Sequence, residues 1–484
     1  MKLGRRTFLK LAGATAAGAA ATACSAAPPA SVPSSAPGTS LPPSSSVPPP
    51  SGPPDWAALR KKVSLLLPGD SGYDNAKRVF NPAFDGREPA AIALCAKPED
   101  VQAAVSAAAR RIPIAARGGG HSYGGYSVPD GGLMIDLGGM SSVDVQGEQV
   151  VIGAGAKLKD VYAKLGGAGR CLPAGSCPTV GIAGLTLGGG IGVLARKYGL
   201  TCDHLVSAQI VTADGKLRTA SADSEPDLFW ALRGGGGGNF GVVTSFTFRT
   251  DPAPSAVSVF SLRFPAGSAN DVLAQWQRWL PEAPPELWAN VVLSGGSPVG
   301  CRVSGCYVGD SASLTTELSR LTDKSGATQT MKQLDYLGAM KYFSGSENRQ
   351  SFVASSRILG EPADPAKLTS ALSGRRGMDV LIDGLGGAVA EIAPGDTAFW
   401  HRKAIGSVQI YSQADPRNRS AATDSVAEVV TGIGLGGGYV NYIDPALPDW
   451  MTAYYGDNAT RLKQVAKTYD PDKVFGFAQG ITPG

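Results

Sequence analysis

The chain has 484 residues, of which 43% are hydrophobic and 17% are charged, a globular composition with enough length for two domains. Its formal net charge is +4, but the four basic residues Lys2, Arg5, Arg6 and Lys10 lie in a leader that has no acidic residue, so the rest of the chain is neutral. A neutral body without a basic stripe argues against binding to nucleic acid.

Residues 1–24 have the pattern of an export signal. The basic start GRRTFLK is followed by the alanine-rich run LAGATAAGAAATA, which is too short and too weakly apolar to span a bilayer. The Arg5-Arg6 pair resembles a twin-arginine signal, whose machinery exports folded proteins. The run ends at Cys24 in a context similar to a lipoprotein cleavage site, so we expect a lipid anchor there, with ordinary cleavage nearby as the alternative. The expected location is the outer face of the membrane or the surrounding medium.

Residues 25–54 contain no charged residue and consist almost wholly of Pro, Ser, Ala and Gly. Such a segment cannot bury enough apolar surface to fold, so we expect a disordered linker. At roughly 3 Å per residue it would extend up to about 90 Å. That reach suits a tether that lifts a folded body off a membrane, or a spacer that crosses a cell wall.

The folded body is expected to start near Asp55, and short β-rich runs then alternate with glycine turns and helices up to about residue 254. Apolar spacing of three and four residues after Pro98 predicts a helix over residues 98–109. Further elements are expected over residues 112–120, 132–140 and 241–248 (strands) and 227–232 (a helix).

Residues 255–437 have a different character. Strands are expected over 257–264 and 303–308, with an amphipathic helix over 270–280, which indicates a second α+β layer. From residue 438 the chain returns to glycine and aromatic residues and ends in a predicted helix over 458–469.

Two glycine-rich loops contain the residues that are the clearest candidates for a functional site. RGGGHSYGG (117–125) combines three glycines, which let backbone N–H groups approach a pyrophosphate, with His121, one of only three histidines. A later loop of small residues, PAGSCPTVGIAGLTLGGGIG (173–192), holds Cys177. Two ligands without a third do not make a metal site. A third run, VIGAGAKL (151–158), has leucine where a dinucleotide fingerprint needs its last glycine, so it is interpreted as a strand-to-helix turn.

Three motifs resemble the berberine-bridge-enzyme-like oxidases of the vanillyl-alcohol-oxidase (PCMH-type FAD-binding) superfamily. They are ARGGGHSYGGYS, GSCPTVGIAGLTLGGGIG and the C-terminal YVNYIDPAL…YYGDN…RL…YDPDKVF, and the resemblance spans about residues 75–482. It implies an α+β fold, with a two-subdomain FAD-binding domain over 75–254 and a substrate domain with an antiparallel sheet over 255–437. The segment 438–484 would complete the FAD site.

The resemblance also implies the cofactor and how it is held. His121 matches the histidine that bonds to the 8α-methyl group of FAD, and Cys177 matches the cysteine that bonds to C6. Segment 234–243 matches the family's contact with adenine and ribose. The full set of expected cofactor-binding residues is His121, Cys177, Arg117, Gly118, Gly119, Gly120, Ser122, Gly181, Gly184, Gly188, Gly189, Val243 and Asn441. Two anchors would hold the flavin at the rim of an open cleft, which suits oligomeric substrates.

The catalytic base is expected in the segment YVNY (439–442). In the family a tyrosine here takes the proton of the substrate hydroxyl, and a resting tyrosine titrates near pH 10, so its phenolate needs support. An alternating strand would place Tyr439 and Asn441 on one face and Tyr442 on the other, and the choice between the two tyrosines stays open. Tyr123 is expected to line the same site.

These features predict an exported flavoprotein oxidase. Its substrate would be a hydroxyl of a sugar, glycan or secondary metabolite, with dioxygen as second substrate and hydrogen peroxide as product. Val180, at the position thought to gate oxygen, favours an oxidase, and Ile191, where many relatives have tyrosine, puts a plant-type alcohol dehydrogenase in doubt. The alternatives are an FAD-dependent dehydrogenase, an oxidative cyclase, or a non-catalytic flavin-bearing surface protein. Contact with a membrane is expected only through Cys24.

Overall fold

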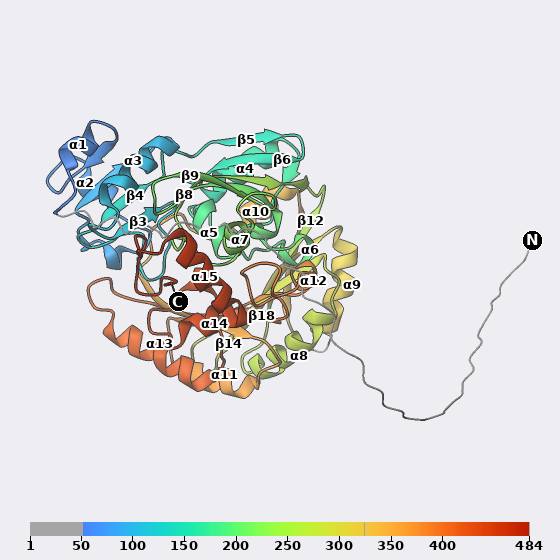
Figure 1. Ribbon diagram of the computed structural model, residues 1–484. Helices are drawn as coiled ribbons and strands as arrows, with labels where there is room; N and C mark the ends of the chain where they lie inside the picture. The colour runs from blue at the N-terminus through green and yellow to red at the C-terminus, as the bar shows by residue number, and fades with distance from the viewer. Residues whose placement is uncertain (1–51, 324, 484) are drawn as a thin grey trace, which may run out of the picture. The chain divides into compact units, whose positions relative to one another are not determined.

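Four sheets organise the part of the chain that the structure, a computed structural model, describes: residues 52–323 and 325–483 (Figure 1). The export signal with Cys24 and all but the last three residues of the predicted linker lie outside the described residues. The body begins as expected near Asp55, whose carboxylate accepts a 2.9 Å hydrogen bond from the Ala58 amide and caps helix α1 (Trp56–Arg60). No helix in the described part is long and apolar enough to cross a membrane.

The first sheet has the strand order β1 (Ser64–Leu66), β2 (Ala91–Leu94), β4 (Leu133–Asp136), β3 (Ile114–Arg117), with β4 parallel to both of its neighbours. Helix α3 (Pro98–Ala108) connects β2 to β3 and confirms the helix predicted over 98–109. Asp100 in its first turn accepts the Ala96 amide at 2.9 Å, and Val101, Ala104, Val105 and Ala108 are fully buried at helical spacing. This packing fixes β3, which leads into the first glycine-rich loop.

The second sheet is antiparallel, with the order β5 (Val143–Gln146), β6 (Gln149–Gly153), β10 (Val242–Arg249), β8 (Leu205–Val211), β9 (Leu217–Ser221). A two-stranded sheet pairs β7 (Arg170–Cys171) with β11 (Asp251–Pro252). The predicted strand over 241–248 and the helix over 227–232 are confirmed as β10 and α7 (Pro226–Ala231). The connecting helices include α4 (Leu158–Gly167), α5 (Ile182–Leu187) and α6 (Ala195–Tyr198).

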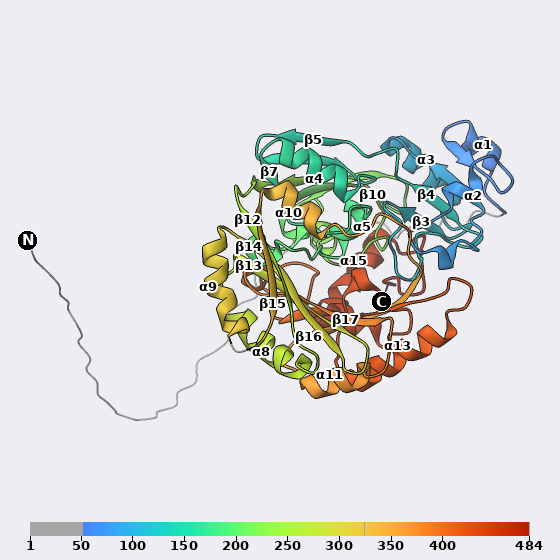
Figure 2. The ribbon, with the colours of Figure 1, turned by 180° about the vertical axis from the view of Figure 1, so that it is seen from behind.

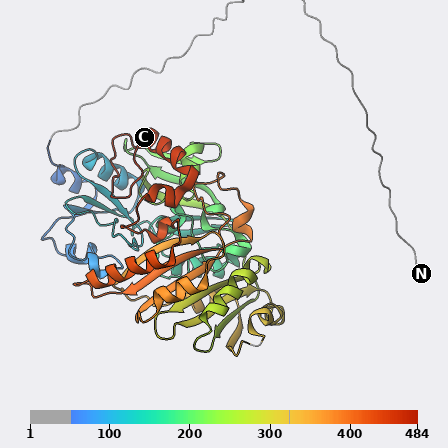
Figure 3. The ribbon, with the colours of Figure 1, turned by 90° about the horizontal axis from the view of Figure 1, so that it is seen from below.

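The third sheet has seven antiparallel strands in the order β15 (Thr328–Leu334), β12 (Val257–Arg263), β14 (Gly300–Val308), β13 (Leu287–Ser294), β17 (Met378–Gly384), β18 (Gly406–Gln413), β16 (Phe352–Leu359). Helices α8 (Ala269–Glu282), α9 (Ser311–Thr322), α11 (Pro365–Leu372) and α13 (Ser420–Ile433) cover one face (Figures 2 and 3). Trp276 on α8 is completely buried in this layer. The antiparallel sheet that the resemblance implied is present, and the fold class is confirmed.

The C-terminal segment runs back between the glycine-rich part and the third sheet. Helices α14 (Trp450–Tyr455) and α15 (Ala459–Tyr469) carry it, and the Tyr455 hydroxyl donates to the Gly235 carbonyl at 2.9 Å. The strand predicted at 439–442 is wrong, because Val440–Tyr442 is a 3-10 turn (η3). The Tyr442 amide donates to the Tyr439 carbonyl at 2.8 Å and the Tyr439 amide donates to the Ser356 hydroxyl at 3.0 Å, so the chain curls against β16 instead of extending.

Candidate active site

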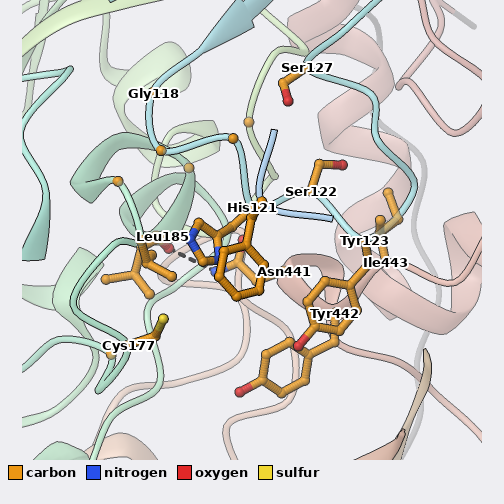
Figure 4. A pocket seen from close by; sticks show the side chains of 18 of the residues that line it. Gly118, His121, Ser122, Tyr123, Ser127, Cys177, Leu185, Asn441, Tyr442 and Ile443 are labelled. Atoms are coloured by element: carbon orange, nitrogen blue, oxygen red, sulfur yellow. Dashed lines mark hydrogen bonds between the residues drawn. The ribbon is translucent and has the colours of Figure 1, made fainter. Parts of the chain in front are cut away.

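One cavity of about 1070 Å³ brings together segments from all parts of the described chain. The loop after β3, the loop before α5, the stretch 236–243, the exposed face of the third sheet and the 439–443 turn line it. The predicted site residues among its lining are Gly118, Gly119, Gly120, His121, Ser122, Tyr123, Cys177, Gly181, Gly184, Val243, Tyr439, Asn441 and Tyr442. Figure 4 shows His121 in the middle of this group, with Cys177 on one side of it and Tyr123 and Tyr442 on the other.

The two glycine-rich loops touch through their backbones. A Cβ atom on Gly119 would lie 2.2 Å from the Gly181 nitrogen, and one on Gly181 would lie 2.3 Å from the Gly119 nitrogen. Only glycine permits this approach at either position, because any side chain would displace a backbone segment. The contact places the residues that follow Gly119 and precede Gly181 at the same end of the cavity.

His121 is held in one orientation. The Phe80 ring stacks on the imidazole with centroids 4.0 Å apart and planes 21° apart, and the imidazole Nε2 lies 2.9 Å from Thr179 Oγ1. Burial, assisted by the charge of Lys157, lowers the pKa of His121 to about 4. The imidazole is therefore neutral near pH 7. When Nε2 carries the proton and donates it to Thr179, Nδ1 keeps a free lone pair.

Thr179 also reaches Cys177. Its Oγ1 lies 3.6 Å from Cys177 Sγ, so one hydroxyl stands within hydrogen-bond range of both predicted attachment residues. Thr179 was not among the site residues expected from the sequence. Its position two residues after Cys177 in the same tight turn was the available signal.

The residues present fit a flavin dinucleotide. Most of the wall between residues 118 and 120, 181 and 184, and 236 and 238 is glycine, which lets an anionic group approach the backbone closely. The Ser127 hydroxyl faces this region, buried and without a hydrogen-bond partner among the described residues. A buried unpaired hydroxyl in a polar cavity is what a ligand oxygen or nitrogen would satisfy.

Three predicted cofactor residues do not line the cavity. The Arg117 guanidinium pairs with Asp136 and donates to the carbonyl of Arg78 at 3.0 Å, so it braces the loop from behind. A Cβ on Gly188 would lie 2.0 Å from Asn441 Oδ1, and one on Gly189 would lie 2.8 Å from the Phe399 ring. These glycines serve protein packing and not direct cofactor contact.

The two candidate bases differ in what their hydroxyl groups meet. The Tyr439 oxygen accepts N–H groups from Gly190 at 3.0 Å, Ile191 at 3.2 Å and Asn441 Nδ2 at 2.8 Å. Its side chain is 2% exposed, and burial raises its pKa to about 12 despite these donors. The Asn441 amide also donates to the Leu185 carbonyl at 2.9 Å, as Figure 4 shows. With three donors on one oxygen, Tyr439 has no lone pair left for a substrate hydroxyl.

Tyr442 faces the cavity and an acid. Its hydroxyl hydrogen-bonds to the Asp383 carboxylate, and its ring stacks on Tyr123 with centroids 5.4 Å apart. Burial raises the pKa of Asp383 to about 6, although hydrogen bonds from Asn290 and Tyr442 act to lower it. Burial also raises the pKa of Tyr442 well above its usual value. The pair can accept a proton at the phenol oxygen and pass the phenol's own proton to the carboxylate.

The exposed face of the third sheet supplies the rest of this end of the cavity. Register aligns Ser261, Ser304, Asn290 and Asp383 in one row across β12, β14, β13 and β17. The neighbouring row holds Arg302 and Gln409, and Gln409 donates to the Tyr123 hydroxyl. Trp288, Tyr342 and Phe343 add an aromatic wall.

None of the residues of this polar face was among the site residues expected from the sequence. Polar residues at every second position of these strands were the only signal in the sequence. No cluster of three or more metal-ligating side chains occurs among residues 52–323 and 325–483.

Comparisons with known proteins agree with this architecture. A family described as an FAD binding domain matches residues 89–221, and one described as berberine and berberine-like matches residues 438–482. An uncharacterized FAD-linked oxidoreductase of Bacillus subtilis, YgaK, is 35% identical over 87% of this chain and 96% of its own length. Chitooligosaccharide oxidase of Gibberella zeae is 33% identical over 86% of this chain and 92% of its own.

Solved structures extend the likeness. A chitooligosaccharide oxidase structure matches with a TM-score of 0.83 and 31% identity, over 88% of this chain and 99% of that chain. A glucooligosaccharide oxidase from Acremonium strictum, described with a 6-S-cysteinyl, 8α-N1-histidyl FAD, matches with a TM-score of 0.81 and 28% identity over 88% of this chain and 99% of its own.

Proposed function

Because the chain belongs to the berberine-bridge-enzyme-like family of FAD-linked oxidoreductases, we propose that it is an oxidase that acts on a hydroxyl group of a saccharide, with dioxygen as acceptor and hydrogen peroxide as product. The chain is an FAD-dependent oxidoreductase by this membership. The saccharide is supported by relatives named as chitooligosaccharide, xylooligosaccharide and glucooligosaccharide oxidases. A wide cavity with a polar sheet face and an aromatic wall suits such a substrate.

His121 and Cys177 would hold the cofactor through two covalent bonds. The His121 imidazole and the thiol of Cys177 lie at the same end of the cavity, and both are within hydrogen-bond range of the Thr179 hydroxyl. Bound FAD supplies the acceptor for the hydride that leaves the substrate carbon. The chain's own contribution at that end is to fix the ring, while backbone N–H groups of the glycine-rich wall hold the phosphates.

The observation that carries the proposal is the Tyr442–Asp383 pair in the same cavity as His121 and Cys177. Tyr442 would take the proton of the substrate hydroxyl as its own proton moves toward Asp383. Asn290 and Tyr442 both hydrogen-bond the carboxylate and keep it oriented. Gln409, through the Tyr123 hydroxyl, would fix the ring that stacks on Tyr442. We therefore propose Tyr442 as the base and Tyr439 as a buried structural partner of the Gly190–Ile191 turn.

The test uses peroxide release and protein-bound flavin together. We expect the chain from Asp55, expressed in bacteria, to release peroxide from at least one neutral or acidic oligosaccharide and to show flavin fluorescence in a denaturing gel. Fluorescence should survive His121→Ala and Cys177→Ala singly and disappear in the double variant. Flavin that separates from the denatured wild type contradicts both attachments. Electron transfer to a dye but not to dioxygen would instead make the protein a dehydrogenase.

We also propose export by the twin-arginine route, with Cys24 as a lipid anchor. The support is the leader itself, with its paired arginines and its small-residue run before Cys24. In a bacterial host that processes such signals, Cys24→Ala should move the protein from the membrane fraction to the soluble exported fraction, and Arg5→Lys with Arg6→Lys should keep it inside the cell. A wild type found only in the cytoplasm would contradict the route.

A further inference from the structure

The cavity-facing side of the third sheet carries an unusual charge arrangement on β12 and β14. Antiparallel register places Arg263 on β12 directly opposite Arg302 on β14, so both side chains leave the same face of the sheet. Both residues are exposed, and Arg302 lines the cavity. Like charges directly opposite each other across two strands destabilise a sheet unless something compensates them.

Neither arginine is compensated by the protein. Among the residues that the structure describes, neither guanidinium has an ion pair or a hydrogen bond, and the two acids of β17 that are equally near in the sheet pattern, Asp379 and Asp383, pair with neither. The other arginine of the cavity lining, Arg87, is different. It approaches Asp130 at 4.0 Å and donates to the carbonyls of Gly124 and Val128, both at 3.1 Å. Arg302 is therefore the lining arginine whose donors remain open.

We propose that the substrate is an acidic saccharide whose carboxylate is bound by Arg302, with Arg263 beside it. Guanidinium and carboxylate match in a planar, two-hydrogen-bond geometry, and a carboxylate placed there would relieve the repulsion between the two arginines. This proposal rests on the proposed function, because it assigns the substrate class of that same cavity.

The register also fixes where the charge sits along the substrate. Arg302 lies opposite Val292 on β13, and Val292 lies opposite Leu381 on β17, two residues from Asp383. Two strand spacings sideways and two residues along the strand separate the Cα atoms of Arg302 and Asp383 by about 12 Å. The carboxylate is therefore on a sugar unit next to the one that is oxidised, and not on the reacting ring.

The aromatic wall lies on the other side of the Ser304–Asn290–Asp383 row from Arg302. Trp288 is on the same face of β13 as Asn290, and its ring meets Phe343 edge-on with centroids 6.0 Å apart. Ser304 and Ser261, whose hydroxyls lie 3.3 Å apart, continue the row from Asp383 toward the arginines. This surface offers polar groups between the proton-accepting end and the cationic end, with a ring face beside them, and an oligosaccharide can span it.

The experiment compares two disaccharides in the flavin-loaded enzyme. The probes are cellobiose and the same disaccharide with glucuronic acid as its non-reducing unit. We expect the KM of the acidic sugar to be at least about tenfold lower, the size of a hydrogen-bonded charge pair. Arg302→Gln should remove most of that preference with little change in kcat, and Arg263→Gln a smaller part of it. Arg278→Gln, an exposed arginine on α8 in the helical layer, is the matched control and should change nothing.

Two further readouts keep the proposal falsifiable. In the wild type, the preference for the acidic sugar should shrink as ionic strength rises, because salt screens an exposed charge pair. Turnover of cellobiose that equals turnover of the acidic sugar, or a preference that survives Arg302→Gln, would overturn the inference and leave the saccharide oxidase standing. If neither these sugars nor a broader saccharide panel reduces the flavin without air, the proposed function falls and the inference falls with it.

Discussion

The two faces of the seven-stranded sheet are made by alternate residues of the same strands, and they do different work. Toward the helices, Val291, Val380 and Ile382 are completely buried in an apolar layer. Toward the cavity, the neighbouring positions hold Asn290 and Asp383, whose polar groups point at one another. A single step along β17 thus moves from a residue that holds the sheet together to one that handles a proton. Alternate residues of the same strand point to opposite faces of the sheet, so one set stabilises the fold and the other set lines the cavity.

The largest loss of activity should result from a substitution on the face of the sheet that lines the cavity. Asp383→Asn removes the acceptor for the Tyr442 proton but keeps the size of the side chain, so we expect kcat for a saccharide substrate to fall by about 10²- to 10⁴-fold, the usual value of a positioned acid or base. The measurement is the rate of flavin reduction in single turnover. A change of less than threefold would remove Asp383 from the proton path.

The wild type and the Asp383→Asn variant should also differ in how kcat/KM and stability depend on pH. The pKa of Asp383 is raised to about 6, so in the wild type kcat/KM should fall as the pH drops below about 6, and that limb should vanish in Asp383→Asn. Folding favours the protonated acid, so wild-type stability declines as the pH rises from about 4 to 6. The side chain of asparagine is never ionised, so burial does not destabilise it in this way. We expect the free energy of unfolding of the Asp383→Asn variant at pH 7 to be about 1–2 kcal/mol higher than that of the wild type after allowing for solvent screening.

The helix face should show the opposite outcome. Ile382→Ala, one residue away from Asp383, leaves a cavity in the apolar layer and should lower the free energy of unfolding by about 2–5 kcal/mol. Because its side chain points away from the substrate, kcat at a temperature where the protein is folded should stay within about twofold of the wild type. Denaturant unfolding and single-turnover kinetics check the two halves of this expectation. A large loss of kcat without loss of stability would break the division between the faces.

A smaller effect is expected at Thr179, at the other end of the cavity. Thr179→Val keeps the shape but removes the hydroxyl that meets Nε2 of His121 and Sγ of Cys177, so covalent loading of FAD should slow by about 2- to 10-fold, the value of one neutral hydrogen bond. Intact-protein mass spectrometry over time after adding FAD to cells starved of it would follow the loading. Thr179→Ser should load like the wild type, and equal rates for all three proteins would contradict the role.

The glycine loops could be located from the sequence because backbone geometry itself demands glycine. Gly119 and Gly181 meet through their backbones, a requirement that leaves a visible mark in the residue pattern. The helix over 98–109 was equally readable, since its apolar period and the acidic residue of its first turn act locally.

The proton-accepting pair could not be located from the sequence in the same way. Asp383 and Tyr442 come from a central strand and from a turn far along the chain, and nothing local in either segment records their meeting. The turn at 439–442 was expected as a strand because its residues favour one, whereas its contacts with Ser356 and Gly190 decide its shape. Arg117 was expected among the cofactor-binding residues, yet its guanidinium forms an ion pair with the buried Asp136.

The hydrogen bond from the Gly190 amide to the Tyr439 hydroxyl joins residues 249 positions apart, and the last residues of the chain reach back in the same way when Ile481 donates to Asn239 at 2.9 Å. In each pair the second partner is synthesised long after the first. Contacts of such long sequence separation form slowly, after the local elements. The cavity walls therefore close after the local elements, and capture of the flavin must wait for the segment that holds Tyr439 and Ile481. Loss of Ile481 would remove one of the hydrogen bonds that join this late segment to the cavity wall at Asn239.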